Sequence, residues 1–145
     1  MTREIELCID SRLENVALVG AAVHAISAGV GFPEGERANI ELCVVEAVSN
    51  CVRHAYREEP GHEVRVHVRA DEAGVEIHVF DDGSPVPEEN RIPREPDFDP
   101  NDLLSIPEGG RGTFLMHTLM DSVRYGKVGG ANLLAMTKAL KPGEP

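Results

Sequence analysis

The chain has 145 residues, of which 41% are hydrophobic, and this predicts one domain over residues 1–145 around a single core. Its 14 Lys and Arg against 25 Asp and Glu give a formal net charge of −11, which argues against direct binding of nucleic acid or of an anionic membrane. Only 4% of the residues are aromatic and none is Trp, which argues against a stacking platform for single-stranded nucleic acid.

The cysteines indicate a reducing compartment. Cys8, Cys43 and Cys51 are odd in number and contain no C-x-x-C pair, so we expect three buried small hydrophobic residues rather than disulfides or a zinc site. The N-terminus shows no apolar signal segment. The uncharged stretch 16–32 is shorter than a membrane span and contains His24. Together these features predict a cytoplasmic protein.

The first half of the chain predicts one strand and two helices. Apolar and charged residues alternate over residues 4–10, which is typical of a half-buried strand. A helix is expected next, because Ser11-Arg12-Leu13-Glu14 has the spacing of a capping box and apolar residues recur at helical intervals up to Gly29-Val30-Gly31. The longest helix is expected over residues 34–56.

The second half predicts two hairpins and a long loop. Alternating runs at 64–69 and 75–79 predict an antiparallel hairpin with one solvated face. Residues 86–108 contain five prolines, seven acidic residues and two arginines, which predicts a loop that serves as a lid or binding loop. A short helix near 114–120 and a final hairpin over 122–140 follow. The expected fold class is α+β: a two-layer sandwich with helices on one face of a mostly antiparallel mixed sheet.

Two polar residues share one face of the long helix. Glu46 and Asn50 are four residues apart, so they project from nearly the same angle, about 6 Å apart along the axis. The pair is either the solvated edge of an amphipathic helix or a carboxylate and an amide that hold Mg²⁺ together with phosphates. His54 continues the same line and is interpreted as a helix cap or a core contact.

A second candidate site follows a predicted strand. The segment Asp81-Asp82-Gly83-Ser84-Pro85 comes directly after Phe80 and is first of all a turn signal. Its place at a strand end, with a glycine that lets a ligand approach the backbone, makes Asp81 a candidate acceptor for an exocyclic amine.

A third candidate site is rich in glycine. Gly109-Gly110-Arg111-Gly112-Thr113 joins the long loop to an expected helix start, where free backbone N–H groups and the helix dipole favour a phosphate. The alternative is a hinge without a ligand. The segment is not a Rossmann fingerprint, because Leu115 stands where the third glycine would fall, and the chain contains no G-K-[ST] of a P-loop.

Combined, these three patterns resemble the Bergerat-type ATP-binding fold. The residues over 46–56, 110–116 and 119–125 resemble a narrower family, the anti-sigma factor serine/threonine kinases of bacterial stress and sporulation control. The order of expected elements agrees with that family over essentially the whole chain.

The resemblance implies ATP and Mg²⁺ as cofactors and a lid over about residues 86–112. It implies that Asn50 ligates Mg²⁺, that Glu46 is the general base, and that Asp81 binds the adenine amine with Gly83 beside it.

For the phosphates, the resemblance implies contacts with Gly110, Arg111, Gly112 and Thr113. Related folds often carry a Thr after the glycine pair that precedes the last strand. This chain has Ala131-Asn132 there, so the second adenine contact stays unassigned.

The resemblance further implies a homodimeric protein kinase and anti-sigma factor, which phosphorylates an anti-anti-sigma protein on serine or threonine and sequesters a sigma factor. The alternative is a non-catalytic, ATP-responsive binding module that regulates a sigma factor or another signalling protein. Glu46 favours the kinase, because a binding module needs no carboxylate there. A gyrase-type or chaperone-type ATPase is disfavoured because 145 residues leave no room for a transducer domain. A sensor histidine kinase is disfavoured because no phosphoacceptor helix precedes the domain.

Overall fold

The computed structural model describes residues 1–91 and 108–141, and for 108–111 the backbone only. The elements follow the expected order. They are β1 (Arg3–Asp10), the 3-10 turn η1 (Leu13–Asn15), α1 (Val16–Val30), α2 (Glu34–Asn50), the π-helical turn η2 (Cys51–Ala55), β2 (Glu63–Asp71), β3 (Gly74–Asp81), α3 (Glu88–Arg91), α4 (Glu108–Leu119), β4 (Ser122–Val128) and β5 (Ala131–Ala139).

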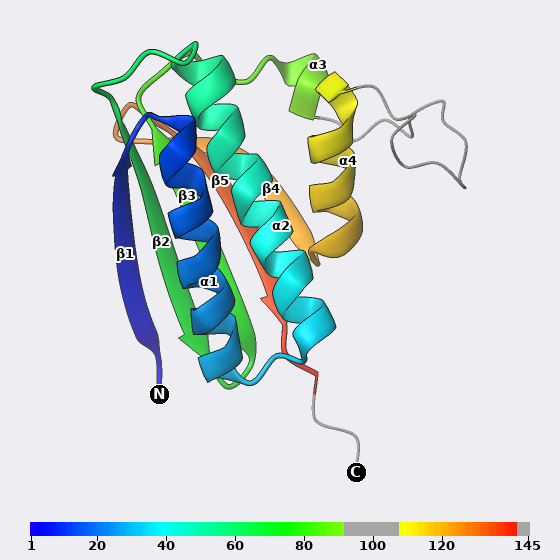
Figure 1. Cartoon of the computed structure of the whole chain (residues 1–145). Helices are drawn as coiled ribbons and strands as arrows, with labels where there is room; N and C mark the ends of the chain where they lie inside the picture. Colours follow the sequence, from blue (N-terminus) through cyan, green and yellow to red (C-terminus); the bar gives the residue numbers. More distant parts are fainter. Residues whose placement is uncertain (92–107, 142–145) are drawn as a thin grey trace.

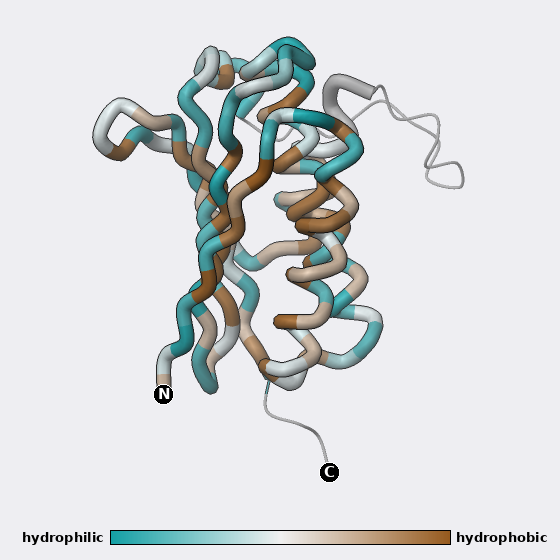
Figure 2. The backbone as a smooth tube through the Cα atoms, turned by 60° about the vertical axis from the view of Figure 1, so that its left-hand side comes forward, coloured by the Kyte–Doolittle hydropathy of each residue, from teal (hydrophilic) through white to brown (hydrophobic). Residues whose placement is uncertain are grey.

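The five strands form one sheet in the order β1-β2-β3-β5-β4. Each neighbouring pair of these strands is antiparallel, so the sheet over the described residues has none of the parallel pairing that a mixed sheet would include. The helices α1, α2 and α4 cover one face of this sheet (Figure 1). Figure 2 shows the sheet and the helices as two layers. The α+β two-layer prediction is confirmed.

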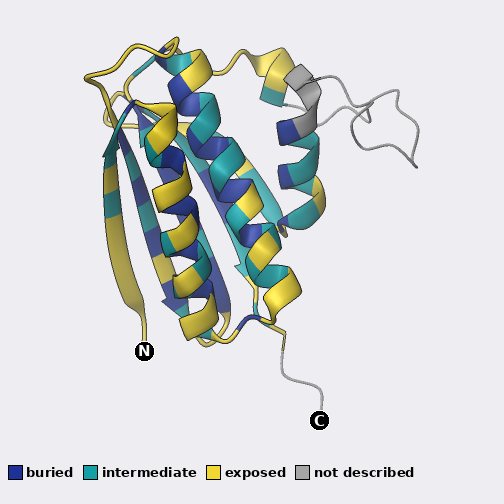
Figure 3. Ribbon diagram, viewed as in Figure 1, coloured by how far each residue is buried: buried dark blue, intermediate teal, exposed yellow. Residues whose placement is uncertain are grey.

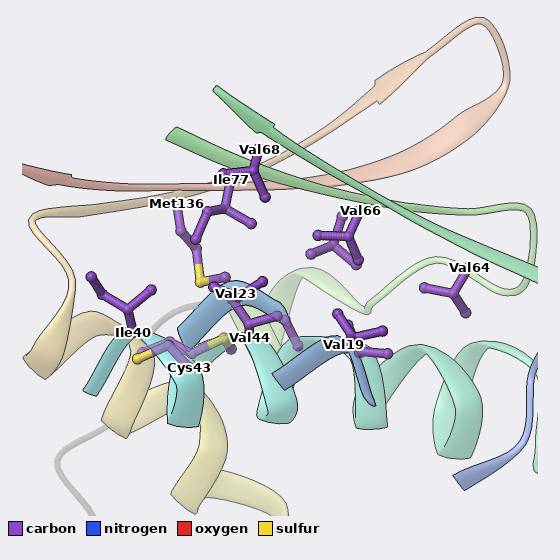
Figure 4. Close-up of a cluster of buried hydrophobic side chains, with 14 of the residues drawn as sticks. Val19, Val23, Ile40, Cys43, Val44, Val64, Val66, Val68, Ile77 and Met136 are labelled. Carbon is purple, nitrogen blue, oxygen red and sulfur yellow. The ribbon is translucent and has the colours of Figure 1, made fainter. Parts of the chain in front are cut away.

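The core lies between the two layers. Strand alternation directs Val64, Val66 and Val68 of β2 toward the helices, where each is at most 1% exposed. Figure 4 shows these valines facing Val19 of α1 and Val44 of α2. Full burial of such a side chain contributes roughly 1.5–3 kcal/mol, so this interface fixes the helices on the sheet. Figure 3 shows the burial concentrated along the inward sides of the helices and strands.

Helix α1 carries little charge. Within the described residues, Leu13–Val30 is the segment that is long and apolar enough to cross a membrane by length and composition. The core helix of a globular protein passes the same test, and Val16, Val19 and Val23 of α1 are buried in this core.

Two local expectations were wrong. Ser11 does not cap the following helix: its hydroxyl donates to the Glu59 carbonyl at 2.6 Å and accepts from the His62 N–H at 3.1 Å. These bonds tie the end of β1 to the loop before β2, and the chain enters α1 through η1 without a side-chain cap. Cys8 is exposed rather than buried, because it alternates with Leu7 on β1 and therefore lies on the face away from the helices.

Candidate active site

A π-helical turn ends the long helix. The N–H of Tyr56 donates to the Cys51 carbonyl at 2.9 Å, five residues back, in place of a regular α-helical bond. Single π-turns inside helices frequently occur at functional sites. The turn changes the direction of the side chains that follow Asn50. His54 is exposed, so its interpretation as a core contact was wrong.

Cys51, whose N–H still bonds to the Ala47 carbonyl in α-helical register, lies beside Asp81 at the end of β3. Its thiol donates to Oδ2 of Asp81 at 3.3 Å. Burial and the charge of Asp81 raise the pKa of this thiol well above its ordinary value, so Cys51 stays protonated and can act as a donor. The sequence predicted Cys51 only as a small hydrophobic residue, and no local pattern indicates this contact.

Asp81 is 8% exposed and is surrounded by donors. Oδ1 accepts from the Gly83 N–H at 2.9 Å, which closes the turn that the sequence predicted. Oδ1 also accepts from Nδ2 of Asn132 at 2.8 Å. The same Nδ2 donates to the Gly83 carbonyl at 2.9 Å. Asn132 therefore stabilises both ends of the turn. It lies on β5, at the position that pairs with Asp81 of β3.

Gly83 is required by close packing. A Cβ at this position would lie 2.4 Å from the Ala55 carbonyl oxygen, so the backbone passes the end of η2 at a distance that only glycine allows. The Ser84 N–H donates to the same carbonyl at 3.0 Å. Tyr56 adds a further link, because its hydroxyl accepts from the Asp82 N–H and donates to the Glu63 carbonyl, both at 2.7 Å.

The glycine-rich segment of α4 packs against Glu46 of α2. The expectation that Gly109–Thr113 precedes the helix was wrong, because α4 begins at Glu108 and contains the segment. Gly112 is buried, and a Cβ there would lie 2.4 Å from Oε2 of Glu46. The Glu46 carboxylate thus lies against α4 at its glycines. The free N–H groups of a helix are its first four, which here belong to residues 108–111, and the side chain of Arg111 lies outside the described part.

Tyr125 contacts both α4, through Thr113, and α3, through Arg91. Tyr125 of β4 is hydrogen-bonded to Thr113; burial raises the pKa of this phenol, and the bond to Thr113 lowers it. The Arg91 guanidinium lies 5.8 Å from the centre of the Tyr125 ring, and Arg91 Nε donates to the Val86 carbonyl at 3.0 Å. The remaining part of the predicted lid, residues 92–107, lies outside the described residues.

The amide of Asn50 on α2 is the candidate ligand for a magnesium ion. Within the part of the chain that the structure describes, no group of three His, Cys, Asp or Glu residues could hold a metal by itself. Mg²⁺ is usually held by one or two protein oxygens, together with phosphates and water. The half-buried Asn50 amide, one turn from Glu46, offers such an oxygen.

Comparison with known proteins identifies the family of the chain. The model of the family described as "Histidine kinase-like ATPase domain" matches residues 9–138. A protein named serine-protein kinase RsbW from Bacillus subtilis is 30% identical over 137 residues, which cover 94% of this chain and 85% of that protein. The protein of the same name from Bacillus velezensis is 31% identical with the same coverage.

Solved structures share the fold. The RsbU and RsbW domains of Rv1364c from Mycobacterium tuberculosis superpose with a TM-score of 0.65 at 17% identity; the match covers 97% of this chain and 33% of that one. The histidine kinase domain of a blue-light-activated kinase from Erythrobacter litoralis gives 0.52 at 18% identity, covering 90% of this chain and 61% of that one. The chain therefore belongs to the histidine kinase-like ATPase domain family, and within it is a homologue of the serine-protein kinases named RsbW.

Proposed function

We propose that this protein is an ATP- and Mg²⁺-dependent serine/threonine kinase that phosphorylates an anti-anti-sigma protein and sequesters a sigma factor. The observation that carries the proposal is the contact between the Glu46 carboxylate and Gly112. It puts a proton acceptor beside the glycine-rich segment to which the family resemblance assigns the phosphates. An ATP-binding module without catalysis has no need for that arrangement.

In the proposed site, the acceptor serine hydroxyl gives its proton to Glu46, a step that contributes typically 10²- to 10⁴-fold in rate. Asn50 ligates Mg²⁺, which when bound neutralises charge on the transferring phosphate. Asp81 accepts a hydrogen bond from the adenine amine. The N-terminal turn of α4, with Gly110, supplies backbone N–H groups toward the phosphates.

The proposal of protein partners is supported by the names of the relatives. Relatives over nearly the whole chain are named serine-protein kinases, which supports a protein substrate with an acceptor serine. The net charge of −11 also favours protein partners over nucleic acid. We propose an anti-anti-sigma substrate, a sequestered sigma factor, a homodimer and a cytoplasmic location, as the resemblance implies.

The test is single-turnover phosphorylation of the candidate anti-anti-sigma partner by wild type and by Glu46→Gln at saturating ATP. We expect the rate of transfer to fall by roughly 10² or more while ATP affinity changes little. Glu41→Gln is the matched control, because Glu41 lies on the same helix but contacts the His24 imidazole of α1 at 2.7 Å. Equal rates for wild type and Glu46→Gln would remove Glu46 from the mechanism. Wild type that binds ATP but transfers no phosphate would support the binding module.

A further inference from the structure

Asp81 has one acceptor position left. An ionised carboxylate offers about four lone-pair positions on its two oxygens. Two donors, the Gly83 N–H and the Asn132 amide, contact Oδ1, while one donor, the Cys51 thiol, contacts Oδ2. Oδ1 is therefore saturated, and the remaining position is on Oδ2.

The Asn132 amide has only one favourable orientation. Its Nδ2 is 2.8 Å from Asp81 Oδ1 and 2.9 Å from the Gly83 carbonyl, and both of these neighbours are acceptors. The NH₂ group satisfies them with its two hydrogens, whereas a flipped amide would place its oxygen against two other oxygens. The hydrogen bond from Asn132 Nδ2 to Asp81 Oδ1 fixes the plane of the Asp81 carboxylate.

The Cys51 thiol limits the other oxygen. It is 8% exposed and carries a single hydrogen, so it occupies one side of Oδ2 and leaves the other side free. A serine at this position would retain a donor, whereas an alanine would leave Oδ2 with two free positions.

We propose that Cys51 and Asn132 are positioning residues, which hold Asp81 with one acceptor position free and thereby make the nucleotide site select a purine with an exocyclic amine over one with a carbonyl at the same ring position. The inference rests on the proposed function, which places the base at Asp81. An amine N–H pairs with the free position, whereas a carbonyl oxygen would face a buried carboxylate oxygen without a proton between them. A site built to hydrogen-bond one group strongly rejects the analogue that lacks it.

The experiment measures the Kd values of ATP and inosine triphosphate by titration calorimetry with Mg²⁺. In inosine triphosphate a carbonyl replaces the exocyclic amine, and the adjacent ring nitrogen carries a hydrogen. For wild type we expect a ratio of roughly 10- to 100-fold or more in favour of ATP. Cys51→Ala and Asn132→Leu should lower this ratio several-fold, whereas Cys51→Ser should keep it. Asn132→Ala, which removes the amide donor without adding a charge, replaces Asn132→Leu if that variant does not fold.

Cys43→Ala is the matched control. Cys43 is a second buried cysteine; it belongs to α2 and lies eight residues, about 12 Å of helix, before Cys51. The control should lose stability like Cys51→Ala and leave the ATP to inosine triphosphate ratio unchanged, because a purely structural defect weakens both nucleotides equally.

The outcomes separate the two proposals. Wild type that prefers ATP, with the full ratio retained in Cys51→Ala and in the Asn132 variant, would overturn the inference and leave the proposed kinase intact. Wild type that binds both nucleotides equally would overturn the inference together with the base contact of Asp81. Wild type that binds neither nucleotide would overturn the proposed function as well.

Discussion

Replacing Gly112 by alanine should slow phosphoryl transfer while it leaves the stability of the fold almost unchanged. The added Cβ would lie 2.4 Å from Oε2 of Glu46, and real Cβ contacts are essentially never under 3.0 Å, so the carboxylate has to move away. It is the far end of a flexible side chain, so the move costs little stability. Alanine in place of glycine inside a helix favours folding by up to about 1 kcal/mol. We therefore expect the free energy of unfolding to change by less than about 1 kcal/mol.

Catalysis should respond much more strongly than stability. A displacement of about 1 Å at a catalytic group can cost roughly 10²-fold in rate, so single-turnover phosphoryl transfer should fall by that order in Gly112→Ala. Urea unfolding and the phosphorylation assay are run on the same preparations. Gly35→Ala is the control, because Gly35 lies in the first turn of α2 with nothing within 4 Å of its added Cβ. A normal rate in Gly112→Ala, with unchanged stability, would refute the assignment of Glu46.

Three further predictions concern the turn at Gly83, the proposed ligand Asn50, and His117 of α4. Gly83→Ala would place a Cβ 2.4 Å from the backbone oxygen of Ala55. A backbone atom cannot move aside as a side chain does, so we expect the free energy of unfolding in urea to fall by about 1 kcal/mol or more and ATP to bind more weakly. Unchanged values would contradict this packing. Asn50→Ala should reduce the gain in ATP affinity that Mg²⁺ gives in titration calorimetry, and an unaltered gain would exclude Asn50 as the ligand. Burial lowers the pKa of His117, so the unfolded chain binds a proton more readily, and stability should fall as the pH drops from 6.5 through the lower pKa of the folded state. His117→Gln should flatten this part of the pH dependence in urea unfolding, and an equal slope in both proteins would contradict the burial effect.

Periodicity along the chain determined much of the fold. The alternating valines of β2 and β3 predicted the hairpin and its buried face, because neighbouring side chains of a strand point to opposite sides. The pair Glu46 and Asn50 is visible in the sequence for the same kind of reason, since four residues complete about one helical turn. Such patterns depend only on the repeat of a strand or a helix, which is the same in every short stretch of that structure.

Propensity alone placed the start of α4 too late. The glycines at 109, 110 and 112 each cost about 1 kcal/mol in a helix, so the sequence predicted a break there. The structure includes them in α4, where Gly112 lets the helix approach Glu46 of α2. Packing against a neighbouring helix overrides weak local preferences.

The order of the elements and the polar residues that mark the site can be predicted from local patterns along the chain. Which of these residues come into contact depends on how the elements pack. Cys51, Asp81 and Asn132 are separated by 30 and by 51 residues, and their contacts require the packing of the end of α2 against β3 and the pairing of β3 with β5. The physical reason is that a hydrogen bond needs a donor and an acceptor within about 3 Å, and that distance is set by register and helix pitch rather than by local periodicity.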